Sequence, residues 1–219
     1  METTDLAKPG SRVRGGRVAH LFARSGGADG NERLTAATAL VLLLLLAVEG
    51  VTILFLRPLL SVHVFVGMLL IPPVALKLGA VGYRFARYYA GSRPYRLKGP
   101  PHLFMRVLIA PVLVAATLGL FASGVALLVV GPGRGIVLGL HKASFVVWLG
   151  AMSVHVLAYV LRLPGLVRAD WRRSGRENGG YLRSGLLAAS LVVGLTLALF
   201  TLQYAAPWVH WAQIAHGDR

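Results

Sequence analysis

The sequence predicts an all-α integral membrane protein whose chain forms five transmembrane helices. Hydrophobic residues make up 56% of the 219 residues and charged residues only 14%, whereas soluble domains carry about 25% charged residues. Five apolar runs are each long enough to cross the ~30 Å hydrocarbon core of a bilayer as a helix. Lys and Arg gather between these runs, which favours a membrane protein over a soluble protein with a large core.

The apolar runs divide the chain into consecutive segments. They cover about 34–56, 59–81, 103–130, 136–161 and 184–204. Residues 1–33 are rich in Gly, Arg and Asp and lack apolar periodicity, so we expect a disordered cytoplasmic tail there. The remaining segments are a four-helix transmembrane bundle over 34–162, a basic cytoplasmic linker over 163–183, a fifth transmembrane helix over 184–205 and a short outer tail over 206–219.

The positions of the basic residues predict how the chain is oriented. The N-terminal tail and the linkers 84–106 and 162–183 are basic, whereas the connections 57–58 and 131–135 carry one Arg each. Cytoplasmic segments of membrane proteins collect Lys and Arg. We therefore expect the N-terminus inside and the C-terminus outside, in the inner (plasma) membrane of the cell.

Composition excludes several classes of site and partner. The chain has no cysteine, which rules out disulfides, thiolate metal sites, iron–sulfur clusters and covalently attached c-type haem. The net charge of +15 follows from the basic cytoplasmic segments, so we expect no nucleic-acid binding. No Ser-His-Asp, HExxH or paired-carboxylate arrangement is present.

Five ionisable residues stand out inside the predicted helices. Charged groups are costly in hydrocarbon, so each such residue is a candidate functional residue. They are Glu49, His63, Lys77, His141 and His155.

His63 and His141 lie near the outer ends of the second and fourth helices, which run in the same direction. Two neutral imidazoles at matched depth on neighbouring helices are the axial ligand set of a b-type haem. Gly67, one turn after His63, leaves room for a flat ring close to the backbone. The other interpretation is that these histidines make ordinary hydrogen bonds between helices.

A second haem is a further hypothesis. His155 follows His141 by 14 residues, which places it ~21 Å further along the same helix face. The partner of such a haem would occupy position 77, where the chain has Lys77, a poor haem ligand unless burial removes its proton. We therefore expect one haem or two. In another pairing, His155 binds with His63, but matched depth favours the pair His63 and His141.

Lys77 and Glu49 have alternative roles. Lys77 lies near the inner end of its helix, where its ammonium group can extend to the cytoplasmic interface. Glu49 can hydrogen-bond an axial histidine, carry a proton, or make a polar contact between helices. The sequence does not choose among these roles.

The histidine pattern resembles that of the bacterial membrane cytochrome b superfamily, whose members are haem-binding four-helix bundles in hydrogenases and formate dehydrogenases. The residues that carry the resemblance are His63 with Gly67, His141 with Ser144 and Phe145, and His155. It covers roughly 35–162, with the fifth helix peripheral. The stretches LLIPPVALKLGAVGYRFARYYAG and GPPHLFMR are also similar to a group of uncharacterised actinobacterial-type membrane proteins. At Lys77 the chain departs from the family, which has a fourth histidine near that position.

The resemblance implies an electron-transfer subunit of an oxidoreductase, not a catalyst of its own. Its partners would be quinone and, for a single-haem form, an extracytoplasmic redox protein. The alternative function is that of a non-haem scaffold or small transporter, in which the intramembrane His and Glu residues serve packing or proton relay.

The orientation can be tested with reporter fusions. A reporter fused after Gly91 or after Asn178 should report the cytoplasm, and one fused after Gly217 should report the outside, because the basic linkers are retained on the inner side. The opposite result at any of these three positions would contradict the orientation.

Overall fold

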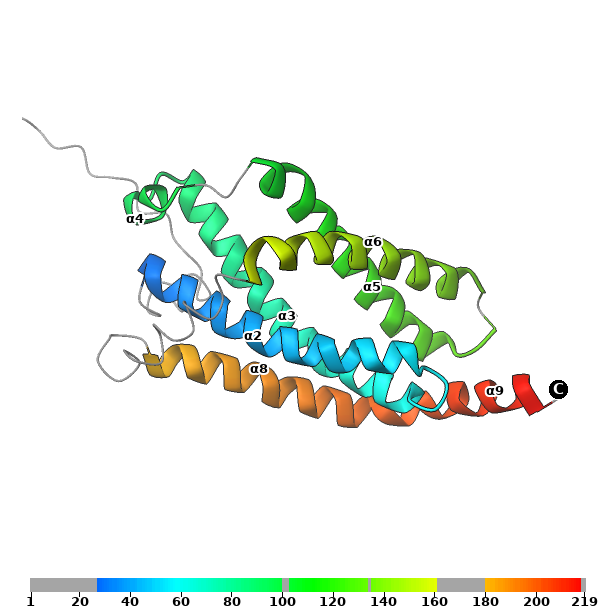
Figure 1. Ribbon diagram of the computed structural model, residues 1–219. Coiled ribbons are helices and arrows are strands. Elements are labelled where there is room, and N and C mark those ends of the chain that lie inside the picture. Colours follow the sequence, from blue (N-terminus) through cyan, green and yellow to red (C-terminus); the bar gives the residue numbers. More distant parts are fainter. Residues whose placement is uncertain (1–26, 100–102, 134, 161–179, 218–219) are drawn as a thin grey trace, which may run out of the picture.

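Helices account for the regular structure of the described part of the chain, in which no strand occurs. The structure is a computed structural model that describes residues 27–99, 103–133, 135–160 and 180–217. The long helices are α2 (Gly27–Leu54), α3 (Leu60–Tyr89), α5 (Ala110–Val130), α6 (Gly135–Tyr159) and α8 (Gly180–Thr201) (Figure 1). The short ones are α4 (Arg93–Leu97), the π-helical turn η1 (Met105–Ile109), the 3₁₀ turn η3 (Leu202–Ala205) and α9 (Ala206–Gly217).

The predicted all-α fold is confirmed. Within the described residues, five helical segments are long and apolar enough to cross a membrane. Their outward-facing side chains are apolar and exposed, as Leu118, Leu157 and Val192 illustrate at 59%, 75% and 63% exposure. Apolar surface of this extent is stable against lipid and not against water. The chain therefore has the architecture of a multi-pass membrane protein.

The first helix begins earlier than the sequence predicts. Residues 27–33 belong to α2, although the segment 1–33 was expected to be a disordered tail. Asn31 is fully buried and its Nδ2 donates a hydrogen bond of 3.0 Å to the Ala80 carbonyl oxygen of α3. This contact between helices stabilises a turn whose polar composition does not indicate a helix. Residues 1–26 lie outside the described part of the chain.

The linker between α3 and α5 is docked against the helices that precede it. It contains α4, whose Tyr95 is buried and packs edge-on against Tyr83 with ring centroids 6.0 Å apart. After α4, the ammonium group of Lys98 forms ion pairs with Asp29, at 2.6 Å, and with Glu32 of α2. Of the second basic linker, predicted over 163–183, residues 163–179 lie outside the described part of the chain. Residues 180–183 belong to α8 and not to a linker, so the fifth spanning helix begins earlier than the predicted 184.

The segment 206–219, expected to be a short tail, is helical over Ala206–Gly217. The 3₁₀ turn η3 joins this helix, α9, to α8. Trp208 of α9 donates a hydrogen bond of 3.0 Å from Nε1 to the Leu127 carbonyl oxygen near the end of α5. α9 therefore contacts the other helices directly.

Two packing units make up the membrane-spanning part. The first is a three-helix layer, in which α2 and α8 pack along α3. α3 continues through Pro72 and Pro73 as one helix. A Cβ atom added to Gly194 of α8 would lie 2.5 Å from the Leu69 carbonyl oxygen, so only glycine allows this approach. The fifth spanning helix was expected to be peripheral, and this expectation is wrong for the packing, because α8 packs more extensively on α3 than α2 does.

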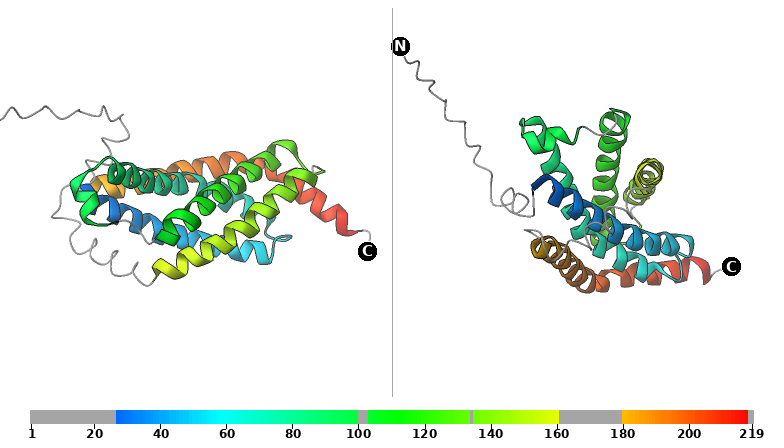
Figure 2. Two further views of the ribbon diagram at one scale, coloured as in Figure 1. Left: turned by 90° about the horizontal axis from the view of Figure 1, so that it is seen from above. Right: turned by 60° about the vertical axis from the view of Figure 1, so that its left-hand side comes forward.

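The second unit is the α5–α6 hairpin. The Trp148 indole Nε1 donates a hydrogen bond of 3.1 Å to Thr117 Oγ1, and a Cβ atom on Gly119 would lie 2.9 Å from Ser144 Oγ. In contrast to this close packing inside the hairpin, its contacts with the three-helix layer are few (Figure 2). The four helices expected as a bundle over 34–162 thus pack mainly as two pairs, α2 with α3 and α5 with α6.

The contact between α3 and α8 predicts a large difference between two glycine substitutions in α8. Gly194→Ala should lower the free energy of unfolding by about 1–3 kcal/mol, because the new methyl group displaces backbone. Thermal unfolding in detergent measures this change. Gly185→Ala is the matched control, since no atom lies within 4 Å of the added Cβ, and it should leave the stability unchanged or slightly higher. Equal stability of the two variants would contradict the described contact.

Candidate functional site

His63 belongs to the first turn of α3 and contacts the end of α2. Its Nδ1 atom lies 2.9 Å from Glu49 Oε1 and 3.1 Å from Thr52 Oγ1. Thr52 is buried and its hydroxyl lies 2.7 Å from the Glu49 carbonyl oxygen and 3.1 Å from Glu49 Oε2. α2 and α3 run antiparallel, and the short connection between them brings these three residues together.

His141 has an equivalent environment in the other hairpin. It lies in the second turn of α6, and its Nδ1 atom is 3.1 Å from the Leu120 carbonyl oxygen and 3.0 Å from Ser123 Oγ, both in α5. The Ser123 hydroxyl donates to the Gly119 carbonyl oxygen at 2.6 Å. A helical serine commonly bonds its own backbone in this way.

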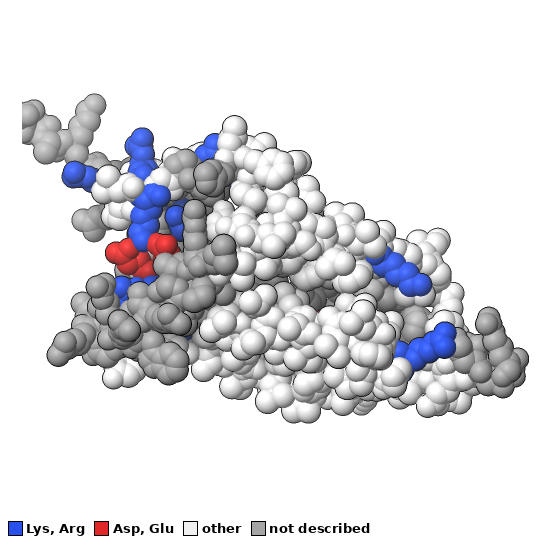
Figure 3. Space-filling model, viewed as in Figure 1, with Lys and Arg blue, Asp and Glu red and all other residues white. Residues whose placement is uncertain are grey.

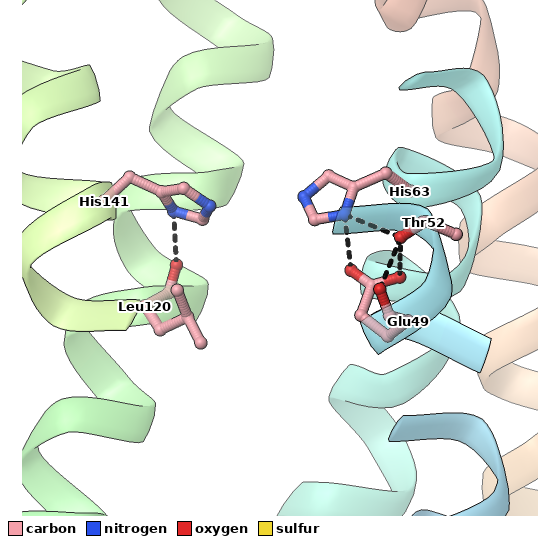
Figure 4. Close-up of polar contacts among 5 residues, drawn as sticks. All are labelled: Glu49, Thr52, His63, Leu120 and His141. Atoms are coloured by element: carbon pink, nitrogen blue, oxygen red, sulfur yellow. Dashed lines mark hydrogen bonds and ion pairs between the residues drawn. The ribbon is translucent and has the colours of Figure 1, made fainter. Parts of the chain in front are cut away.

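These contacts indicate which nitrogen of each ring carries the proton. A backbone carbonyl only accepts hydrogen bonds, so Nδ1 of His141 is the donor, and Nδ1 of His63 is the donor when it pairs with an ionised Glu49. In a neutral imidazole, the lone pair then lies on Nε2. Figure 4 shows the two rings facing each other with their Nε2 atoms directed inward. Among the described residues, neither Nε2 atom has a hydrogen-bond partner.

The two histidines belong to the same level of the molecule. α3 and α6 both begin at the end where α2 and α5 finish (Figure 1). The His141 and His63 rings face each other at this level (Figure 4). The structure therefore brings together the residues that matched depth had paired, His63 and His141, one from each packing unit.

Lys77 and His155 lie at a second level, toward the other end of α3 and α6. They are close enough for their charges to interact. The Lys77 ammonium group donates a hydrogen bond of 2.9 Å to the Thr35 carbonyl oxygen of α2. The His155 ring packs on Tyr159 with centroids 5.1 Å apart. Lys77 is thus bonded to the N-terminal part of α2.

Two glycines border the site. A Cβ atom on Gly67 would lie 3.6 Å from Glu49 Oε1, an ordinary van der Waals contact, so Gly67 faces the carboxylate. The idea that Gly67 admits a flat ring stays a prediction. Gly124 of α5 tolerates a side chain less well than Gly67 does, because a Cβ there would lie 3.2 Å from His141 Cε1. Any side chain at this position pushes against the ring.

Sequence reasoning missed Thr52, Leu120, Ser123 and Gly124. Threonine, serine and glycine are common in membrane helices, and a backbone carbonyl has no signature in the sequence. The only available signal was the pairing of each histidine with a hydroxyl residue on the preceding helix. To recognise that pairing, one must know the register between the two helices, and the sequence alone does not give this register.

The described residues contain no group of three or more His, Asp or Glu side chains that could hold a metal ion. A site that takes three or four ligands from side chains is therefore not formed there. Two facing imidazoles can complete the ligand set of a metal ion whose remaining ligands belong to a cofactor.

No family model matches the sequence, and comparison with curated proteins and with solved structures finds no match. The resemblance to the membrane cytochrome b superfamily stays a prediction. The function has to be argued from the geometry of His63 and His141.

Proposed function

We propose that the chain is a b-type haem membrane cytochrome that uses His63 and His141 as axial ligands. One observation carries the proposal. Two imidazoles at one level, on separately packed units, have their Nδ1 atoms bonded to acceptors and their Nε2 atoms directed at each other (Figure 4). Haem iron takes four nitrogens from its own ring and two axial ligands from the protein, so two histidines complete the set.

The energetics favour a functional role over a structural one. A charged side chain inside a spanning helix costs free energy on insertion scales, up to about 3 kcal/mol at the bilayer centre. A hydrogen bond between membrane helices returns only ~0.6 kcal/mol on average. The contact of 2.9 Å between Glu49 and His63 is therefore a poor way to stabilise two helices. It is a good way to orient an imidazole, because a carboxylate bonded to Nδ1 sets the tautomer and strengthens Nε2 as a ligand.

Bound haem supplies one-electron transfer. The chain's own contribution is to hold the two imidazoles. Glu49 and Thr52 restrain His63, and the Leu120 carbonyl and Ser123 restrain His141. We place one haem at this level. Because Lys77 is bonded to the Thr35 carbonyl, we do not assign a second haem to Lys77 and His155.

In the cell, such a chain would act as an electron-transfer subunit in the inner (plasma) membrane, with its N-terminus in the cytoplasm. A single haem near the outer side would exchange electrons between the quinone pool and an extracytoplasmic redox protein. These partners rest on the resemblance and on the predicted orientation, whereas the ligand pair rests on the geometry.

The alternative is a non-haem scaffold or small transporter. The observation that favours it is the direct contact between the Glu49 carboxylate and the His63 imidazole, since pairs of this kind carry protons in pumps and transporters. The alternative gives no reason for the matching environment of His141 on the other hairpin. Haem binding accounts for both.

The absorption spectrum tests the proposal directly. The chain purified from haem-replete cells should show a Soret band that sharpens and shifts on dithionite reduction. His63→Ala and His141→Ala should each abolish it, because either change removes one axial ligand.

His155→Ala is the matched control and should retain the full haem content, since it removes a membrane histidine from a different level. A colourless wild-type preparation would refute the haem and favour the alternative. Loss of part of the haem from His155→Ala would indicate a second site.

Glu49 should control both the affinity for haem and its reduction potential. Glu49→Leu should weaken haem binding by about 10–100-fold, as the loss of an outer-shell partner typically does. Glu49→Gln keeps an acceptor for Nδ1 but removes the negative charge, so the haem should be retained at a higher reduction potential. Haem retention and potentiometric titration measure the two effects.

Lys77→Met provides the control for removing an intramembrane charge and should leave the haem content unchanged. If Glu49→Leu binds haem as tightly as the wild type and Glu49→Gln keeps its potential, Glu49 does not orient His63.

A further inference from the structure

Basic residues gather at the end of the molecule that carries α4 (Figure 3). Arg84 and Arg87 lie in the last turns of α3, and Arg93 and Arg96 lie in α4. α4 packs beside that end of α3. At the opposite end, Arg57 and Lys142 are exposed.

The acidic residues near α4 are already occupied. The described part of the chain contains only Asp29, Glu32 and Glu49 as acidic residues. Lys98 pairs with the first two. Burial lowers the pKa of Lys98, but its hydrogen bonds to the two carboxylates outweigh burial and the pKa lies above its usual value. The pairs therefore persist at neutral pH, and no described carboxylate forms an ion pair with an arginine of α4.

α4 is held in place by its neighbours. A helix of five residues is not stable by itself in water. Tyr95 is 5% exposed and packs against Tyr83, and Arg87 Nη2 donates a hydrogen bond of 3.1 Å to Ser92 Oγ just before the helix. With Tyr95 directed inward, Arg93 and Arg96 are left exposed on the outer surface.

A large apolar side chain is exposed beside these arginines. Leu97 follows Arg93 by one helical turn in α4 and is 79% exposed. Phe85 and Tyr89 are exposed as well, but they lie on the face of α3 opposite Arg87 and α4. An exposed leucine next to arginine gains no apolar contact from nucleic acid or from an acidic soluble protein. The boundary between headgroups and acyl chains accepts both kinds of side chain. The position at the end of the spanning helix α3 agrees with that boundary.

We propose that this surface binds the headgroups of anionic phospholipids. It consists of Arg87, Arg93 and Arg96 with Leu97, and we name it the basic collar. The arginines contact the negatively charged phosphate of the headgroup, and Leu97 enters the adjoining acyl region. The proposal does not depend on haem.

The test uses the full chain purified in neutral detergent micelles. Phosphatidylglycerol and phosphatidylcholine are titrated in separate experiments, and the midpoint of thermal unfolding and the lipid retained in native mass spectra are recorded. Phosphatidylglycerol should raise the midpoint and be retained, because a ligand that binds only the folded state stabilises it. Its effect should fall as salt is raised, since the contacts are electrostatic.

The double variant Arg93→Gln/Arg96→Gln should weaken the response to phosphatidylglycerol by roughly 30-fold, from the typical contribution of two basic residues at an anionic surface. Arg57→Gln/Lys142→Gln is the matched control, because it removes two positive charges from the opposite end, and it should respond as the wild type does. Circular dichroism checks that both variants remain helical.

Three results would each overturn the proposal. They are an equal response to the two lipids, an equal loss of response in both double variants, and tighter binding of a duplex DNA oligonucleotide than of phosphatidylglycerol. The last result would assign the basic collar to nucleic acid.

Discussion

Hydrocarbon offers no hydrogen-bond partner to a polar side chain, and the placement of polar groups in this protein depends on that constraint. Hydroxyl side chains meet it locally by bonding carbonyl oxygens of their own helix, as Thr38 and Thr117 do. A side chain that is too long or too strongly charged to bond its own helix instead bonds a neighbouring helix, as Lys77 bonds the Thr35 carbonyl. Each such bond fixes the register of two antiparallel helices, so the polar side chains largely determine which residues face each other.

The two histidines meet the constraint in the same way, each within its own hairpin. His63 bonds through Nδ1 to α2, and His141 bonds through Nδ1 to α5. With Nδ1 occupied, Nε2 is left toward the region where the hairpins face each other (Figure 4). The difference between the two environments is the acceptor, a carboxylate for His63 and a neutral carbonyl for His141. Two imidazoles held by separately packed units are the arrangement from which we infer a shared cofactor.

Packing between the helices depends on small residues, because lipid removes the hydrophobic driving force for helix association. Gly194 lets α8 approach the backbone of α3 at Leu69, and Gly119 lets α5 approach Ser144 of α6. These contacts make α8 part of the layer that carries His63. The fifth helix was expected to be peripheral because the resemblance to membrane cytochromes covers only about 35–162. A resemblance that depends on histidines says little about van der Waals contact.

Composition and hydropathy by themselves determined the number of spanning helices, since an apolar run of sufficient length has no other stable form in a bilayer. The topology also predicted that His63 and His141 lie at similar depth, because both lie near the starts of apolar runs that cross the membrane in the same direction. Only the tertiary structure decided that Glu49 and Thr52 contact one ring, that Ser123 and the Leu120 carbonyl contact the other, and that Lys77 bonds to Thr35. The reason is physical. Depth follows from the rise along a helix, whereas contacts between helices follow from rotation and register, which close packing sets collectively.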